Sequence, residues 1–331
     1  MDRRIDDDPK VQIVARRLGV RVRKGLRFAI QDAAEARVRG WMNEFSLEPS
    51  SLSDVHLTTL NRLRLKVHQV KSDRDFHRIG SRLRTEMPNL PQQLELEFGE
   101  RDTEALLMRR RSGSRSGRYV AVIDARGDRV HRAWYAERHE ASHLLIEDPS
   151  TDHVWRRSGD SAPIERVVDA VAARVGFWPD LVRPLVQAAD GGDDGLLKAF
   201  GGLRQEVAPD ASMEASFRAF ARYLEYPALL LYCDLGARKG EQSKGAAASS
   251  YALRVRSVVW SSTAASHNLF IPHNYRIPKH SVIHEAGRAG PGKVFIQDDR
   301  LGRWTSSGGR RLADVPVQVE ARGRWALLTL R

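Results

Sequence analysis

A short motif with the chemistry of a metal site lies near the middle of the chain, in the order His139-Glu140-Ala141-Ser142-His143. The apolar spacing around it predicts a helix, and on a helix two residues four positions apart lie on the same face. His139 and His143 can therefore bind one metal ion, while Glu140 lies beside an open coordination position. Two imidazoles and a carboxylate that accepts a proton from metal-bound water are the groups that a zinc hydrolase needs. The motif predicts one catalytic zinc ion per chain, with Glu140 as the catalytic base.

A catalytic zinc site needs a third protein ligand, with one position left for water. The best candidate is Glu165, which lies on the next predicted helix, 22 residues beyond His143. Asp169 lies one turn further along that helix, where its carboxylate can accept the outer N–H of a ligand histidine and fix the orientation of the ring. The alternatives for the third ligand are Glu147, Asp148 and His153. The first two lie too close in sequence to the motif to fold back easily, and the last lies in a predicted loop.

The elements that must position this motif are two strands and the motif helix itself. Apolar runs predict strands at 104–110 and 119–123, separated by a Gly- and Ser-rich turn at 112–117. The motif helix follows at 130–146, with an apolar stripe that begins at Val130. In zinc peptidases, an edge strand beside the motif helix commonly holds extended substrate by strand addition.

The remaining elements are predicted from hydrophobic periodicity and from helix and strand breakers. Pro88 and Pro91 are predicted to end a helical N-terminal region, and Pro179 to end the helix that carries Glu165. Further helices are predicted at 10–46 with a turn near Gly19, 54–72, 74–86, 164–176, 194–207 and 212–226. Strands are predicted at 229–233, 251–260, 268–272, 293–297, 315–321 and 325–330, after a linker at 236–250. The sequence thus predicts an α+β fold.

The composition favours a globular protein of the cytoplasm. The 331-residue chain is 41% hydrophobic and 29% charged, which is ordinary for soluble domains. It has no run of about eighteen apolar residues, which a membrane helix needs, and its polar, acidic start is unlike a secretory signal. The single cysteine, Cys233, excludes an intrachain disulfide framework, and its apolar neighbours favour a buried thiol over a nucleophile. A reducing compartment and no membrane contact are therefore expected.

The chain is strongly basic, with a formal net charge of +12 and more Arg than Lys. Such a charge favours weak contact with nucleic acid or an acidic partner, although a GC-rich genome alone also enriches arginine. The rival function is therefore a DNA-binding regulator, with residues 194–226 as a helix-turn-helix. Against it, the second helix offers only Arg218 and Arg222 for reading bases. A third alternative is an interaction protein with a degenerate site, which the intact motif argues against.

Four histidines near the C-terminus raise the question of a second metal site: His267, His273, His280 and His284. The segment His284-Glu285-Ala286-Gly287-Arg288 contains only the first half of the zinc motif, because arginine replaces the second histidine. Scattered histidines in a β-rich region are usually surface residues. We therefore predict no second metal site.

The segment Arg129–Ile146, with its H-E-x-x-H-x-L pattern, resembles the motif helix of the ImmA/IrrE metallopeptidases. The segment Ile164–Ala173, followed by Pro179, is similar to their second signature, which reads acidic ligand, three residues and asparagine before a proline stop. Glu165 falls on the ligand position of that signature and Asp169 on the asparagine position. The resemblance therefore implies the same three ligands as the spacing does.

The sequence departs from the family pattern at several positions. Ser142 stands where glycine is usual, Arg138 where a small apolar residue is usual, and Asp169 where asparagine is usual. Trp178-Pro179 replaces Met-Pro, with one extra residue in that helix. These departures remove no ligand and leave the base in place, but they leave the substrate open.

Further along the chain, 212–233 looks like the helix-turn-helix-like segment and following strand of the IrrE branch, and 253–330 is similar in layout to its GAF-like domain. The resemblance implies a zinc endopeptidase that cleaves a helix-turn-helix (XRE-type) repressor and so derepresses stress-response or mobile-element genes. The GAF-like region would sense a signal or dock a partner. An oxyanion-stabilising group is also needed, and Arg218, Tyr223 and Tyr226 are the candidates.

The expected organisation follows from the elements and this resemblance. It comprises a helical N-terminal region at 1–100, a zincin-like metallopeptidase core at 101–190, a helix-turn-helix-like segment at 191–235, a linker at 236–250 and a β-rich GAF-like domain at 251–331.

Overall fold

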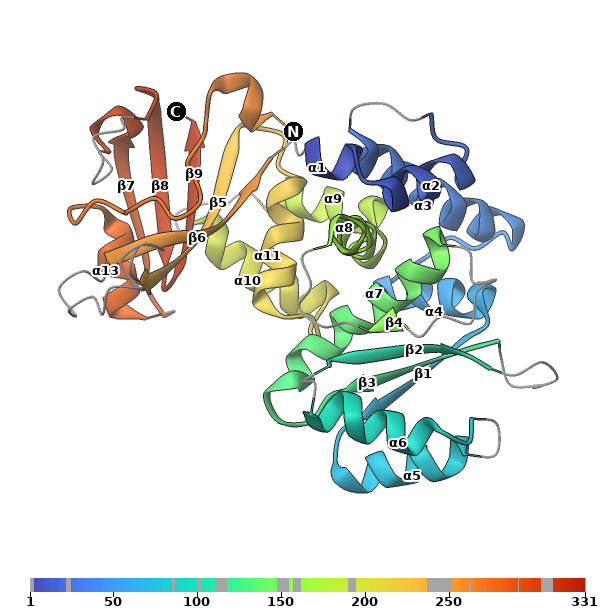
Figure 1. Ribbon diagram of the computed structural model, residues 1–331. Helices are drawn as coiled ribbons and strands as arrows, with labels where there is room; N and C mark the ends of the chain where they lie inside the picture. The colour runs from blue at the N-terminus through green and yellow to red at the C-terminus, as the bar shows by residue number, and fades with distance from the viewer. Residues whose placement is uncertain are drawn as a thin grey trace. The chain divides into compact units, whose positions relative to one another are not determined.

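The computed structural model contains two compact units, which we describe separately. The first comprises Met1–Leu181 and Asp210–Ser212, and the second comprises Val182–Pro209 and Met213–Arg331. The structure describes residues 3–21, 25–84, 87–100, 103–110, 118–147, 155–156, 162–189, 195–236, 252–261, 263–290, 292–304 and 312–330. Each unit combines helices with one sheet, so the fold belongs to the mixed α+β class that the sequence predicts (Figure 1).

A four-stranded mixed sheet lies at the centre of the first unit. Its strands are β1 (Leu65–Val70), β2 (Ala105–Arg109), β3 (Tyr119–Asp124) and β4 (Trp155–Arg156), in the order β1-β3-β2-β4. The β1 strand is parallel to β3, whereas β2 runs antiparallel to both of its neighbours. Nearly all residues of β2 and β3 are buried, as expected for strands that are covered on both faces.

Helices make up the rest of the first unit. They are α1 (Arg3–Asp6), α2 (Pro9–Arg17), α3 (Leu26–Glu44), α4 (Leu52–Leu63), α5 (Asp73–Leu83), α6 (Leu90–Glu95) with a π-helical turn at Leu96–Glu100, α7 (Val130–Ile146) and α8 (Pro163–Gly176). Side chains cap several of them: the carboxylate of Asp8 accepts backbone N–H groups at the start of α2, and Ser51 with Asp54 forms a capping box on α4.

The two faces of the sheet are covered by different helices because successive side chains of a strand alternate in direction. Ala121 and Ile123 of β3 pack with α7, whereas Val120 and Val122 pack with α5 and α6. Figure 1 shows α7 on one side of the sheet and α5 and α6 on the other. The residues of α7 that face the sheet are mostly alanines, so the helix axis can approach the strands closely. On its other side α7 packs against α8, which in turn packs against α3.

The second unit contains a five-stranded antiparallel sheet in the order β6-β5-β9-β8-β7. Its strands are β5 (Ala228–Gly236), β6 (Ala252–Trp260), β7 (Val294–Arg300), β8 (Pro316–Arg322) and β9 (Trp325–Leu330). Its described helices include α10 (Leu196–Val207), α11 (Met213–Arg222) and α13 (Val282–Ala289), and α9 (Pro179–Ala188) precedes them in the chain. Because β5 pairs with both β6 and β9, residues on the two sides of the predicted linker belong to one sheet. Beyond Gly236 that linker lies outside the described residues.

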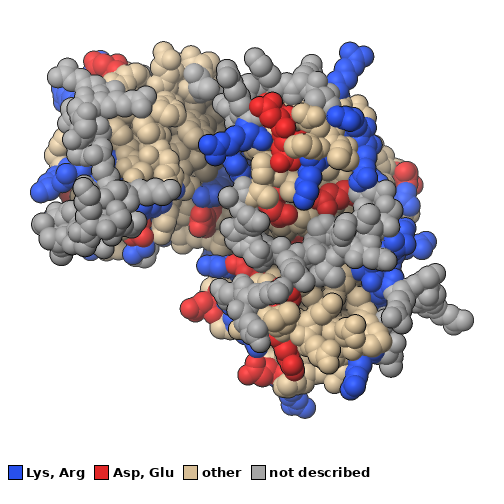
Figure 2. All heavy atoms as spheres, in the orientation of Figure 1, with Lys and Arg blue, Asp and Glu red and all other residues tan. Residues whose placement is uncertain are grey.

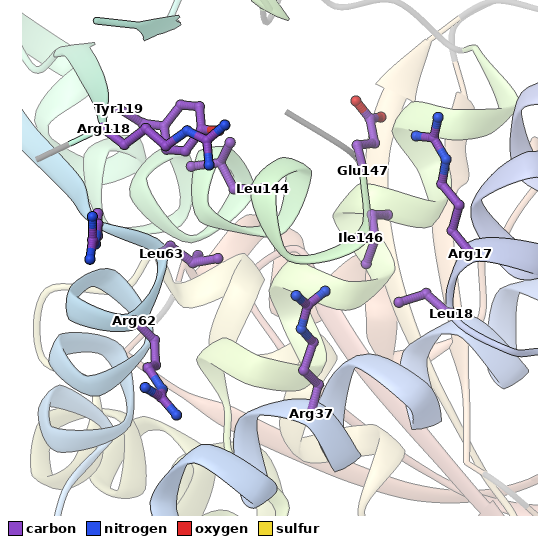
Figure 3. Close-up of a pocket in the computed structure, with 11 residues that line it drawn as sticks. Arg17, Leu18, Arg37, Arg62, Leu63, Arg118, Tyr119, Leu144, Ile146 and Glu147 are labelled. Carbon is purple, nitrogen blue, oxygen red and sulfur yellow. The ribbon is translucent and has the colours of Figure 1, made fainter. Parts of the chain in front are cut away.

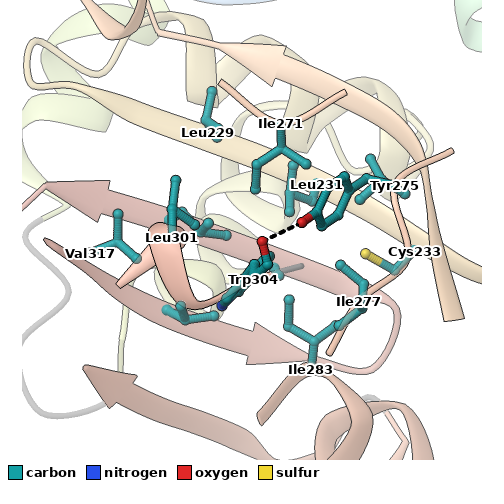
Figure 4. Packing of buried hydrophobic residues seen from close by; sticks show 14 of the residues in the cluster. Leu229, Leu231, Cys233, Ile271, Tyr275, Ile277, Ile283, Leu301, Trp304 and Val317 are labelled. Atoms are coloured by element: carbon teal, nitrogen blue, oxygen red, sulfur yellow. Dashed lines mark hydrogen bonds between the residues drawn. The ribbon is translucent and has the colours of Figure 1, made fainter. Parts of the chain in front are cut away.

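The core of the second unit lies between one face of this sheet and α13. Leu231 and Cys233 of β5 pack there with Ile283 of α13, and the phenol of Tyr275 donates a 2.6 Å hydrogen bond to the carbonyl of Trp304 (Figure 4). Both aromatic side chains are buried, so this bond satisfies polar groups that would otherwise be costly to bury.

The structure corrects two predictions about where helices end. The predicted helix at 54–72 ends at Leu63, Arg64 takes a left-handed conformation with φ of 52°, and β1 follows. Pro91 does not end a helical region but lies in the first turn of α6. The helix α8 ends at Gly176, before Pro179, as predicted, and Pro179 itself begins α9. Proline is tolerated in the first turn because the backbone N–H it lacks has no partner there.

Two further predictions are corrected. The segment 268–272 forms no strand, although Leu269 and Ile271 are buried in the core as a strand pattern would place them. Val130 is 45% exposed and therefore lies outside the apolar stripe of α7. The order of strand, turn, strand and motif helix at 104–146 is confirmed for its described elements, whereas the turn at 112–117 lies outside the described residues.

Candidate metal centre

The H-E-x-x-H motif lies in the second half of α7, the part of the helix that is most deeply buried. Residues His139, Glu140 and His143 are exposed by only 1%, 0% and 3%. Titratable side chains are rarely buried so completely unless they are paired or bind a metal. The sheet covers one side of the helix and α8 the other, so these side chains are held by rigid elements.

Glu165, in the first turn of α8, meets both histidines. Its Oε2 atom lies 3.1 Å from Nε2 of His139 and 3.5 Å from Nε2 of His143. The two Nε2 atoms lie 3.2 Å apart. The structure therefore brings together the three side chains predicted as ligands, with their donor atoms all within 4.8 Å of one another.

These distances fit a single zinc ion. Nitrogen and oxygen ligands about 2.0–2.1 Å from zinc in a tetrahedral arrangement lie about 3.3 Å from one another. The three distances between donor atoms, 3.1, 3.2 and 3.5 Å, lie on both sides of this value. Two imidazoles and one carboxylate are also a donor set that zinc takes in catalytic sites, with the fourth position left for water.

Carboxylates orient the outer nitrogens of both rings. Oδ1 of Asp169 lies 2.9 Å from Nδ1 of His139, and Oε1 of Glu147 lies 3.4 Å from Nδ1 of His143. Tyr135 donates a 2.8 Å hydrogen bond from its phenol to the backbone carbonyl of Asp169. When each carboxylate accepts the outer N–H of a neutral ring, the lone pair lies on Nε2, where it can bind a metal.

Burial alone lowers the pKa of both histidines, but the surrounding carboxylates outweigh it. Hydrogen bonds with Glu147 and Glu165 raise the pKa of His143 to about 10, and those with Asp169 and Glu165 raise the pKa of His139. The charge of Glu140 acts in the same direction on both rings. Burial raises the pKa of Glu165, yet its bonds to the two histidines lower it below its usual range. A metal ion bound here would have to displace protons from this cluster, so its binding would weaken as the pH falls.

Two residues near the site make contacts that were not predicted from the sequence. Glu147, predicted only as an alternative third ligand, directly follows α7 and contacts the outer nitrogen of His143, and its spacing of four residues from His143 was the available signal. Arg138 is 6% exposed, its guanidinium lies 3.5 Å from the ring centroid of Trp134, and burial lowers its pKa to about 9. Asp148 and His153, the other alternative ligands, lie outside the described residues.

The predicted oxyanion candidates belong to the second unit. Arg218 donates a 2.6 Å hydrogen bond to Oγ of Ser257 and pairs with Glu214 at 3.0 Å. Tyr223 is 8% exposed, and the guanidinium of Arg183 lies 5.8 Å from its ring centroid. These contacts are internal to the second unit, so a role for either residue at the metal stays a prediction.

The predicted helix-turn-helix corresponds to α10 and α11, which pack against each other and against the sheet of the second unit. Phe200 of α10 meets Phe217 and Phe220 of α11, and Phe217 also meets Trp325 of β9. The apolar face of α11 is thus used for packing within its own unit.

Basic side chains do not gather on one part of the face that Figure 2 shows. There the described Lys and Arg residues are interspersed with Asp and Glu. The net charge therefore does not by itself locate a nucleic-acid surface. Among the described residues, no helix is both long and apolar enough to cross a bilayer.

A scan against protein-family models finds no match to this chain. A search of curated proteins also finds no significant match. The likeness to the ImmA/IrrE signatures therefore remains one of short motifs, and the cluster itself carries the functional argument.

Proposed function

We propose that the protein is a zinc-dependent endopeptidase. The observation that carries the proposal is the convergence of His139, His143 and Glu165 on one point, beside the fully buried Glu140. The spacing of their donor atoms and the carboxylates on the outer ring nitrogens both support a metal site built for one ion. Two histidines on one helix and an acidic residue on the next form the ligand set of many zinc peptidases.

Each residue has a defined task in this scheme. His139, His143 and Glu165 would hold zinc, while Asp169 and Glu147 fix the orientation of the two imidazoles. Zinc, when bound, lowers the pKa of a coordinated water and polarises the scissile carbonyl. Glu140 accepts the proton of the attacking water at its carboxylate and passes it to the leaving amine.

The substrate in this proposal is a helix-turn-helix repressor, as the resemblance to the ImmA/IrrE signatures implies. The four-stranded sheet with α7 on one face is compatible with a zincin-like core. The five-stranded sheet of the second unit would then be the GAF-like module that senses a signal or docks a partner. Such a protein acts in the cytoplasm, where the repressor is bound to DNA.

The proposal is tested by measuring zinc content and repressor cleavage together. The comparison uses wild type, Glu140→Gln and, as a matched control, Glu95→Gln on the exposed surface of α6. A repressor encoded beside this gene is the first substrate to test. We expect about one zinc per chain in all three proteins, and a loss of cleavage of about 10²–10⁴-fold in Glu140→Gln alone.

Two results would contradict the proposal. Absence of zinc from protein purified without chelator would contradict the proposed metal site. Equal cleavage by wild type and Glu140→Gln would contradict the role of Glu140 as the base. Salt-dependent binding to duplex DNA that survives both metal removal and Glu140→Gln would instead support the DNA-binding regulator.

A further inference from the structure

A cavity of about 470 Å³ opens on the first unit at the C-terminal end of α7. Leu144 and Ile146 of α7 line it together with Glu147, the next residue in the chain, directly beyond the candidate metal ligand His143. Five arginines from four separate places in the sequence also line it: Arg17 of α2, Arg37 of α3, Arg62 and Arg64 at the end of α4, and Arg118 immediately before β3 (Figure 3). Elements far apart in the chain thus place their cations around one cavity.

Among the described residues, few carboxylates compensate the charge of this arginine pocket. Its lining contains one carboxylate, that of Glu147, against five guanidinium groups. Arg62 pairs with Glu44, and Arg37 donates a 2.9 Å hydrogen bond to the backbone carbonyl of Leu145. Within the described part of the chain, Arg17 and Arg118 form no ion pair with a carboxylate. Exposed like charges repel one another, so gathering them lowers stability unless an anion occupies the space between them.

The lining also offers an apolar surface. Leu18, Leu63, Leu144 and Ile146 contribute to it, and the ring of Tyr119 lies beside the guanidinium of Arg118, 5.5 Å from ring centroid to Cζ. A cavity of about 300–1,000 Å³ with apolar walls and a few directed polar groups is typical of sites for small molecules. The arginine pocket has the size and the mixed lining of such a site.

The positions of the five arginines favour a compact phosphate anion over an extended acidic peptide. Guanidinium groups match phosphate oxygens in pairs of parallel hydrogen bonds. A pyrophosphate concentrates several negative charges within a few ångströms, which suits five arginines around one cavity. Carboxylates on an extended peptide carry one charge per side chain at about 3.3 Å per residue, with alternate side chains on opposite faces. A compact polyphosphate therefore compensates the pocket better than an acidic peptide does.

We propose that the arginine pocket binds a compact polyphosphate, namely the pyrophosphate portion of a phosphorylated small molecule whose remainder contacts Tyr119 and the apolar lining. Glu147 both lines this pocket and hydrogen bonds to His143, so the occupant lies beside a residue that orients a candidate metal ligand. Binding itself does not require the proposed peptidase function, because none of the five arginines belongs to the metal cluster.

The test is calorimetric titration of the full chain with inorganic pyrophosphate, with orthophosphate as the weaker probe. The key variant is Arg17→Gln, and the matched control is Arg16→Gln, an exposed neighbour on the same helix that does not line the pocket. Both variants lose one positive charge. We expect pyrophosphate to bind more tightly than orthophosphate, Arg17→Gln to weaken it by about tenfold or more, and Arg16→Gln to leave it nearly unchanged.

A His139→Ala variant separates this site from the metal, because pyrophosphate also binds metal ions. It removes a candidate zinc ligand but neither a residue of the pocket lining nor the histidine that contacts Glu147. Unchanged pyrophosphate affinity in His139→Ala supports the proposal even if no peptidase activity is found. Binding lost in His139→Ala would assign the pyrophosphate to the metal and overturn it.

Other outcomes would also overturn the proposal. Equal weakening by Arg16→Gln and Arg17→Gln would show only diffuse attraction to a basic surface. A glutamate-rich peptide or an oligonucleotide that binds more tightly than pyrophosphate and depends on Arg17 would assign the pocket to a macromolecule instead.

Discussion

Replacement of Asp169 tests whether the metal cluster depends on the hydrogen bond to the outer nitrogen of a ligand. Oδ1 of Asp169 lies 2.9 Å from Nδ1 of His139. Loss of such a partner typically weakens metal binding by about 10–100-fold, or about 1.4–2.8 kcal/mol. The side chain of Asp169 is 48% exposed, so solvent screens part of this effect. We therefore expect Asp169→Ala to bind zinc about tenfold more weakly at pH 8.

Asp169→Ala should also reduce the competition between protons and zinc for His139, which partly offsets the loss of zinc affinity at low pH. Asp169 helps to raise the pKa of His139, so its removal lowers that pKa. Protons then compete less with zinc in the variant than in wild type at low pH. The ratio of zinc dissociation constants between Asp169→Ala and wild type should consequently be smaller at pH 6 than at pH 8.

The assay is competition with a chromophoric chelator at both pH values, with Asp169→Asn as the matched control. Asparagine keeps an oxygen acceptor and loses only the charge, so we expect its affinity to fall by less than about threefold. Equal zinc affinity in Asp169→Ala and wild type at both pH values would refute the role of this hydrogen bond. If Asp169→Asn loses as much zinc affinity as Asp169→Ala, an acceptor oxygen at this position is not sufficient to support zinc binding.

Three further predictions concern stability and reactivity. Burial, and then three nearby cations, lower the pKa of His68 to about 4, so this neutral ring stabilises the fold above pH 6.5 and the contribution is lost as the pH falls through 4. As the pH falls from 6.5 to 4, the free energy of unfolding measured in urea should therefore decrease less for His68→Gln than for wild type. Parallel pH profiles of the two proteins would contradict this. A Cβ at Gly176 would lie 2.7 Å from Cδ of the buried Arg138, so Gly176→Ala should destabilise the protein by about 1 kcal/mol, whereas Gly40→Ala, with nothing within 4 Å, should not. Burial raises the pKa of Cys233, so a thiol reagent should react with it only after unfolding, and rapid labelling of the native protein would show the burial to be wrong.

The clustering of His139, His143 and Glu165 could be predicted because most of its geometry is local. Two histidines four residues apart on one helix must share a face, and the bounds of α7 agree with the predicted 130–146. Glu165 required one further assumption, that α8 packs against α7, which its apolar face supports. The contact between Glu147 and His143 is equally local, but the sequence analysis predicted Glu147 only as an alternative metal ligand.

The β1 strand shows what local pattern cannot predict. Leu65–Val70 follows α4 without a proline or glycine, so it extends the predicted helix. It becomes a strand because it pairs in parallel with β3, from Leu65 opposite Tyr119 to Val70 opposite Asp124. The energy of that pairing comes from residues more than fifty positions away, which no window of the sequence contains.

The division of the C-terminal half was misjudged for a related reason. A polar segment without large apolar residues predicts a linker, and a linker suggests a domain boundary. The β5 strand before that segment nevertheless pairs with β6 after it, from Leu229 opposite Trp260 to Gly236 opposite Ala252. A polar segment inside a hairpin and one between domains have the same composition, and only the pairing of the strands distinguishes them.

The carboxylates around His139 and His143 need a compensating positive charge in this buried part of the molecule. Four carboxylates surround them, those of Glu140, Glu147, Glu165 and Asp169, and each acts to raise the pKa of at least one ring. Placing so many like charges around two buried rings is costly unless cations offset them. Protons on both rings could do so, but their Nε2 atoms lie only 3.2 Å apart, so the two imidazoliums would repel each other. A single divalent ion held by His139, His143 and Glu165 would supply the same two positive charges without that repulsion.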